Sequence, residues 1–138
     1  MSRIVVLDNE AVQALQNPAH PKHRRVVSLA QVVASRKLRA ATVEVAVPTA
    51  VRVEAGWDRT SPEWVFPNRL RIADVPLDAV RASTAAAIRH RTGVSVAGAH
   101  LGTVIQSAPA GQQITVVTSD PGDMRLVAGD REITVVAI

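Results

Sequence analysis

The chain has 138 residues, a length that suits one domain with a single buried core. It contains no cysteine, which excludes disulfides, zinc ribbons and thiol chemistry. Hydrophobic residues make up 47% of the chain, but aromatic residues only 2%. Such an aliphatic core favours strands covered by helices on both faces, and it disfavours a sheet that stacks RNA bases on aromatic side chains.

The N-terminus enters a strand-like segment without a signal-peptide pattern, and the longest apolar run is well short of the ~20 residues of a membrane span. We therefore expect a cytoplasmic protein that does not enter the membrane. The net charge of +4 is unevenly distributed, because residues 11–43 contain no acidic residue. The basic residues of this stretch are Lys22, Arg24, Arg25, Arg36, Lys37 and Arg39. They form either a solvated helix face or a flank that attracts phosphates.

Hydrophobic periodicity predicts alternating strands and helices. Strands are expected at residues 3–7, 42–47, 70–73, 114–117 and 133–138. Helices are expected from residue 9 to 15, 22 to 39, 49 to 56, 76 to 93, 96 to 107 and 121 to 128. The residues on one face of the helix at 76–93 are Leu77, Val80, Thr84 and Ile88. This alternation predicts one α/β domain over residues 1–138, with a parallel sheet and helices on both of its faces.

Two predicted strands end in an aspartate, Asp8 after RIVVL and Asp120 after ITVVTS. In an open parallel sheet, ligands bind outside the carboxyl ends of the strands. Two carboxylates that converge there need a cation, for which Mg²⁺ or Mn²⁺ is suited. Each aspartate can instead cap a helix, and Asp120 with Asp123 has the spacing of a reciprocal cap. Both interpretations stay open at this point.

Other motifs are missing from the sequence. It has no GxGxxG segment, no phosphate-binding glycine-rich loop, no HExxH and no GxSxG. Three of the four histidines, His20, His23 and His90, are expected at the surface. The segment 57–69 holds the aromatic residues of the chain, and it either folds back on the core or forms a contact surface for another protein.

Over nearly its whole length the chain resembles the PIN-domain ribonucleases, and among them the VapC-type toxins of bacterial toxin–antitoxin pairs. IVVLDNEAV resembles the segment of the first acid, which gives Asp8, and VPTAVRVEAGW that of the second, which gives Glu54. VVTSDPGDMRLVA is the closest match and gives Thr118, Asp120 and Asp123.

The third acidic motif departs from the family pattern. In SVAGAHLGTVI, Gly98 stands where the family carries an aspartate, and Ser95 lies three residues earlier. Ala99, His100 and the apolar run that follows still fit the family. The missing carboxylate is expected to weaken metal binding or to disturb the placement of water.

The resemblance implies a three-layer fold whose central parallel sheet has about five strands in the order 3-2-1-4-5. It also implies hydrolysis of RNA with Mg²⁺ or Mn²⁺ as cofactor. Asp8 and Asp120 would be the main metal ligands, with Glu54 as a further ligand or as the group that positions water. Asp123 would contact the ligands and not the metal itself. Thr118 would hydrogen-bond a ligand or phosphate.

The resemblance further implies RNA and a cognate antitoxin protein as partners, and a homodimer. Arg25 and Arg52 are candidates to guide the RNA backbone. Two functions follow: an active endoribonuclease toxin, or a catalytically degenerate PIN domain that binds a partner or RNA. A receiver-like domain is a third alternative, but the last strand, ITVVAI, lacks the lysine that a receiver needs.

Overall fold

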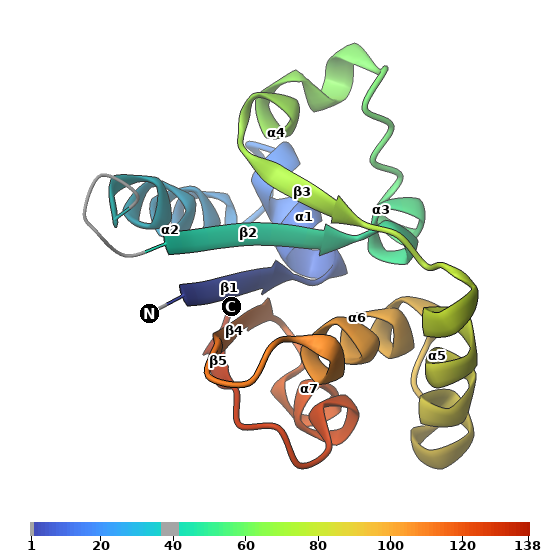
Figure 1. Cartoon of the computed structure of the whole chain (residues 1–138). Helices are drawn as coiled ribbons and strands as arrows, with labels where there is room; N and C mark the ends of the chain where they lie inside the picture. The colour runs from blue at the N-terminus through green and yellow to red at the C-terminus, as the bar shows by residue number, and fades with distance from the viewer. Residues whose placement is uncertain (1, 37–41) are drawn as a thin grey trace.

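The computed structural model describes the backbone of residues 2–36 and 42–138 and the side chains of residues 2–31 and 43–138. Its centre is a five-stranded, fully parallel sheet in the order β3-β2-β1-β4-β5 (Figure 1). The strands are β1 (Ser2–Leu7), β2 (Thr42–Pro48), β3 (Ile72–Val75), β4 (Gln113–Thr118) and β5 (Thr134–Ala137). The predicted α/β class and strand order are therefore confirmed.

Helices connect the strands in the alternating pattern that the sequence predicts. They are α1 (Asn9–Gln16), α2 (His23–Arg36), α3 (Thr49–Ala55), α4 (Val65–Arg69), α5 (Ala79–Thr92), α6 (Val96–Ser107) and α7 (Pro121–Ala128), with a short 3-10 helix η1 (Pro62–Trp64) before α4. The predicted helix at 22–39 is described as far as Arg36, and the predicted basic residues Lys37 and Arg39 lie outside the described residues.

The sheet carries a separate hydrophobic core on each face. One core packs α5, α6 and α7 against the sheet, and the other packs α1, α2 and α3 against the opposite face. Strand β1 lies in the middle and supplies both cores, because Ile4 and Val6 point to the first and Val5 and Leu7 to the second. This continuous apolar run is what a strand buried on both faces requires. The arrangement gives the three layers visible in Figure 1.

Helix α5 buries only part of the face that the sequence predicts. Ile88 is buried and Leu77, just before the helix, packs against the core, whereas Val80 is 78% exposed and Thr84 is also exposed. The helix begins at Ala79, because Asp78 caps it by accepting a hydrogen bond from the N–H of Arg81. Ala85 is buried in place of Thr84.

The segment 57–69 folds back on the core, one of its two predicted alternatives. Trp57 and Trp64 are buried and stack with their ring centroids 5.5 Å apart. The indole N–H of Trp57 donates a hydrogen bond to Asn68 over 2.8 Å. The segment is not irregular throughout, because it contains η1 and α4. Within the described residues, no helix combines the length and the apolar character needed to cross a membrane.

Candidate functional site

The first and last parts of the chain meet at the carboxyl end of the sheet. Strands β1 and β4 are neighbours, with Leu7 opposite Val117, so Asp8 leaves the sheet beside Thr118. Asp8 is only 8% exposed. One carboxylate oxygen accepts a hydrogen bond from the N–H of Ala11 over 2.9 Å and thereby caps α1. The other oxygen accepts from the N–H of Ser119 over 3.2 Å. Asp8 therefore caps α1 and also connects the end of β1 to the segment that follows β4.

Thr118 links the two aspartates that the sequence predicts as ligands. Its side chain is fully buried, and its hydroxyl oxygen accepts a hydrogen bond from the N–H of Asp120 over 2.9 Å. The same hydroxyl lies beside the carboxylate of Asp8 and lowers its pKa. The hydroxyl of Thr118 thus contacts both the carboxylate of Asp8 and the backbone N–H of Asp120.

The net effect of the surroundings is to raise the pKa of Asp8 above its ordinary value. Burial is the largest cause, and the charge of Glu10 acts in the same direction. The hydroxyl of Thr118 and the N–H groups of Ala11 and Ser119 favour the carboxylate but do not outweigh burial. The anionic form of Asp8 is therefore incompletely compensated by the protein, and a cation at this position would stabilise it.

Asp120 and Asp123 lie together at the start of α7. Asp120 caps the helix, because its carboxylate accepts a hydrogen bond from the N–H of Asp123 over 3.1 Å, and Pro121 occupies the predicted first helical position. The pKa of Asp123 is raised, first by partial desolvation and then by the negative charge and hydrogen bonding of Asp120. Asp120 is therefore confirmed as a helix cap, but the predicted reciprocal bond does not form, because the N–H of Asp120 donates to Thr118. The like charges of Asp120 and Asp123 remain close together.

The structure does not bring Glu54 into this group. Glu54 lies on α3 and is exposed. Among the described residues, no group of three or more acidic or histidine side chains is close enough to hold a metal ion. The predicted ligands Asp8, Asp120 and Glu54 are thus not assembled as a preformed three-ligand centre.

Gly98, at the position of the missing acid, lies half-buried in the first turn of α6. Ser95 caps this helix by accepting a hydrogen bond from the N–H of Gly98 over 3.0 Å. A Cβ atom at position 98 would lie 3.3 Å from the hydroxyl of Ser95 and 3.5 Å from the Cβ of Val94. A side chain therefore fits if the serine hydroxyl moves by a few tenths of an ångström.

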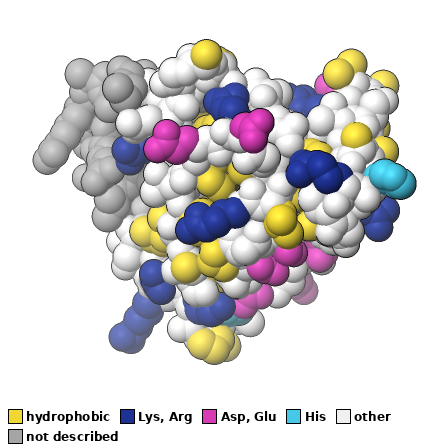
Figure 2. All heavy atoms as spheres, turned by 90° about the horizontal axis from the view of Figure 1, so that it is seen from below, with side chains coloured by type: hydrophobic (Ala, Val, Ile, Leu, Met, Phe, Trp, Pro, Cys, Tyr) yellow, Lys and Arg dark blue, Asp and Glu magenta, His cyan; other side chains and the backbone are white. Residues whose placement is uncertain are grey.

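Ion pairs with basic residues involve only some of the acidic side chains that the structure describes. Asp74, Asp78 and Glu10 each form an ion pair with a basic side chain. Within the described part of the chain, Asp8, Asp120 and Asp123 form no ion pair with Lys, Arg or His. Figure 2 shows acidic side chains in separate places on the face seen there, with the larger group in the lower part of the view. Carboxylates that are close together without basic partners are a typical environment for a divalent cation.

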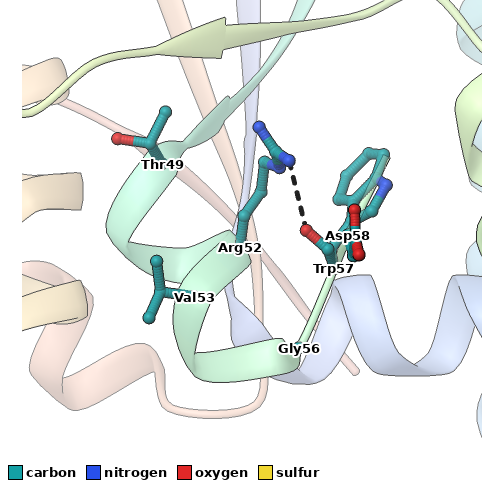
Figure 3. Close-up of a pocket in the computed structure, with 6 residues that line it drawn as sticks. All are labelled: Thr49, Arg52, Val53, Gly56, Trp57 and Asp58. Carbon is teal, nitrogen blue, oxygen red and sulfur yellow. Dashed lines mark hydrogen bonds between the residues drawn. The ribbon is translucent and has the colours of Figure 1, made fainter. Parts of the chain in front are cut away.

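The two predicted RNA-binding arginines have different surroundings. Arg25 is exposed on α2. Arg52 on α3 instead pairs with Asp74 over 3.0 Å and donates a hydrogen bond to the carbonyl of Trp57 over 3.2 Å (Figure 3). It borders an open hollow of about 310 Å³, whose lining residues are Thr49, Arg52, Val53, Gly56, Trp57 and Asp58. Arg52 is therefore part of the structure around Trp57, and its side chain is not free to follow an RNA backbone.

Several contacts around the site have no pattern in the sequence that could predict them. Arg59 forms a bidentate ion pair with Asp74, over 2.8 and 3.2 Å, and lies over the ring of Trp57. His20 and His23 are half-buried, where His20 contacts Glu10 over 2.9 Å and His23 contacts a backbone carbonyl, whereas His90 is exposed as predicted. These partners are distant in sequence or lie in irregular segments, where spacing carries no signal.

No protein-family model matches the chain, and a comparison with curated proteins finds no significant match. The family resemblance therefore depends on the sequence motifs that contain Asp8, Glu54 and Asp120.

Proposed function

We propose that this chain is a PIN-type, metal-dependent endoribonuclease and the toxin of a toxin–antitoxin pair. The observation that carries the proposal is the buried carboxylate of Asp8, hydrogen-bonded to the N–H of Ser119 next to Asp120. It connects Asp8 to the segment that leads into Asp120, at the edge of the sheet where ligands of such folds bind. Fold and strand order agree with what the resemblance implies.

The residues at this edge fit a hard divalent cation. Asp8 and Asp120 would hold it, Asp123 would add negative charge, and Thr118 would keep the carboxylate of Asp8 oriented. Bound Mg²⁺ or Mn²⁺ supplies a water of lowered pKa and offsets the charge that builds on the scissile phosphate. The exposed Arg25 on α2 supports contact with the RNA backbone.

Partner contacts and location are part of the same proposal. Val65 and Phe66 on α4 are 50% and 41% exposed, although the neighbouring Trp64 is buried. Exposed apolar and aromatic side chains of this kind are enriched in protein interfaces. They support a homodimer or a complex with a cognate antitoxin. We propose that the protein works in the cytoplasm, where its RNA substrate is found.

A catalytically degenerate PIN domain is the alternative, and two observations favour it. Gly98 provides no carboxylate, and Glu54 is exposed and separate from the acids at the edge of the sheet. Such a protein would keep the fold and its binding surfaces and would bind a partner or RNA without cutting it.

RNA cleavage with and without metal tests the proposal. The purified chain is incubated with single-stranded RNA of mixed sequence in Mg²⁺, in Mn²⁺ and in EDTA. We expect cleavage with either metal, none in EDTA, and a loss of at least about 100-fold in Asp8→Asn, because removal of a ligand typically lowers activity by that order. Asp130→Asn is the matched control, because Asp130 is an exposed aspartate outside the site.

The outcomes separate the two functions. Equal cleavage by wild type and Asp8→Asn would show that a contaminating nuclease or another site is responsible, and the proposal would be wrong. RNA binding without cleavage by the wild type at any metal concentration would favour the degenerate domain.

A further inference from the structure

His100 on α6 is fully buried, although histidine is a polar residue. Its Nδ1 atom accepts a hydrogen bond from the backbone N–H of Ala50 over 3.2 Å. Ala50 is the second residue of α3, so this contact joins two helices across a sequence separation of 50 residues. The helices also pack directly against one another. The imidazole is therefore held at the junction of α3 and α6.

Helix α3 needs this contact because it lacks a cap of its own. The first N–H groups of a helix have no partner within the helix. The residue at the N-cap position is Pro48, which makes no capping hydrogen bond through its side chain. The chain passes directly from β2 into α3, with no turn that could provide a polar side chain. His100 supplies the acceptor from another element.

The hydrogen bond also fixes the chemical state of the ring. Since Nδ1 accepts, it carries no proton, and the neutral ring bears its proton on Nε2. Burial is the main cause that lowers the pKa of His100, and the charge of Arg81 acts the same way. The carbonyl of Pro76 and the charge of Asp78 oppose it without restoring the ordinary pKa. Nε2 has no hydrogen-bond partner among the described residues, so the contact with Ala50 is the polar anchor of the ring.

We infer that His100 is a positioning residue that caps α3 from α6 and so holds α3, the helix that carries Glu54, in place against α6. Gly98 lies two residues before His100 on α6. The hydrogen bond therefore adds to the direct packing that sets the relative positions of residues 54 and 98. The consequence for metal binding depends on the proposed function, whereas the cap itself does not.

Two substitutions separate capping from simple space filling. In His100→Asn, the Oδ1 atom takes the place of Nδ1 and keeps an acceptor for the N–H of Ala50, although volume is lost. In His100→Phe, the ring volume is kept but the acceptor is removed, which leaves a helix N–H unpaired. A residue that only fills space would tolerate Phe better than Asn. A residue that caps α3 would tolerate Asn better than Phe.

Amide hydrogen exchange followed by NMR tests the cap without reference to activity. We expect the Ala50 amide to exchange slowly in wild type and His100→Asn, and about fivefold faster in His100→Phe, since a lost hydrogen bond costs about 1 kcal/mol. The amide of Val6 in β1 serves as the reference for global unfolding, and rates are compared relative to it. Equal protection of Ala50 in wild type and His100→Phe, or fast exchange in His100→Asn, would overturn the inference.

Titration with Mn²⁺ alone then tests the effect on the site. The resemblance implies that Glu54 on α3 is a further ligand or positions water. On that basis we expect His100→Phe to bind Mn²⁺ more weakly than the wild type and His100→Asn to bind it nearly as well, parallel to the Ala50 exchange. Equal affinity of both variants would contradict the positioning role of His100. An Asp8→Asn variant that keeps full Mn²⁺ affinity would instead contradict the proposed function, so the two failures are distinguishable.

Discussion

The carboxylate of Asp8 accepts a hydrogen bond from the N–H of Ser119, which lies 111 residues further along the chain. The contact is possible because β1 and β4 are neighbours in the sheet and end at the same level. It leaves a buried acid with a raised pKa and, among the described residues, without a basic partner. Such an arrangement costs stability, and perturbed acids of this kind are concentrated at functional sites.

Divalent metal should stabilise the folded chain through Asp8. At a metal concentration about 100-fold above Kd, binding adds about 2.7 kcal/mol to the free energy of unfolding. For a chain of this size each kcal/mol raises Tm by about 2–4 °C. Thermal unfolding with and without Mn²⁺ measures the effect, which should vanish in Asp8→Asn and persist in Asp130→Asn. A wild type whose Tm does not respond to Mn²⁺ or Mg²⁺ would contradict the proposed metal site.

Restoring the missing acid should strengthen metal binding. Gly98→Asp introduces a carboxylate at the position where the family carries one, and the space around Gly98 admits a Cβ once the hydroxyl of Ser95 shifts slightly. We expect a tenfold or greater decrease in the Kd for Mn²⁺, measured by calorimetry, and faster RNA cleavage if the wild type is weakly active. Gly98→Asn, which adds equal volume without charge, is the control. Equal effects of both substitutions would mean that the added charge does not reach the metal.

The strands could be predicted from the sequence because buried parallel strands are continuous apolar runs. RIVVL and ITVV have this pattern, and the aspartates that end them could be placed at one edge from topology alone. The pairing partner of Asp8 could not, because Ser119 contributes a backbone N–H that any residue provides.

Contacts between side chains of distant elements could not be predicted either. The cap that His100 provides for Ala50 depends on how α6 packs against α3, which neither helix encodes alone. The sequence makes Arg52 a candidate for RNA contact because it is a basic residue on a flanking helix. In the structure, Arg52 forms an ion pair with Asp74, and the sequence around Asp74 does not predict this pairing. The exposed position of Glu54 on α3 could not be predicted for the same reason, because it depends on how α3 packs against other elements.

Close packing between α6 and α7 should make Gly102 hard to replace. A Cβ at this position would lie 2.8 Å from the Cβ of Val127 and 3.1 Å from the Cδ1 of Ile88. Gly102→Ala should therefore lower the free energy of unfolding by about 1–3 kcal/mol, despite the better helix propensity of alanine. Gly122→Ala is the matched control, because only an oxygen of Asp120 comes near, at 3.8 Å, and it should be stabilising. Urea unfolding of both variants measures the difference, and equal effects would contradict it.

Arg25 and Arg52 should affect different properties. Arg25→Ala should weaken the binding of single-stranded RNA and reduce the salt dependence of the binding constant by about 0.7 per lost phosphate contact, with stability unchanged. Arg52→Ala should lower the free energy of unfolding by about 1 kcal/mol, because it removes the partly exposed ion pair with Asp74 and a hydrogen bond to the carbonyl of Trp57. Binding is measured in EDTA to prevent cleavage, and unfolding is measured in urea. An Arg25→Ala variant that binds RNA like the wild type would exclude α2 from the RNA contact.

Acid should destabilise the folded chain through His100. Burial lowers the pKa of this imidazole below its ordinary value of 6.5, so the folded state takes up the proton less readily than the unfolded state. Above pH 6.5 the ring is neutral in both states and its contribution does not depend on pH. As the pH falls below 6.5, the unfolded state binds the proton first and the free energy of unfolding decreases, until the lowered pKa of the folded state is reached.

The free energy of unfolding at pH values from 7.5 to 4.5 measures this effect, and the difference between wild type and His100→Asn isolates it. We expect the wild type to lose more stability than the variant below pH 6.5, because asparagine keeps the acceptor for Ala50 but does not titrate. The other histidines contribute equally to both proteins and cancel in the difference. Parallel profiles would mean that the folded state protonates His100 as easily as the unfolded chain does, and the ring could then not be the buried acceptor that caps α3.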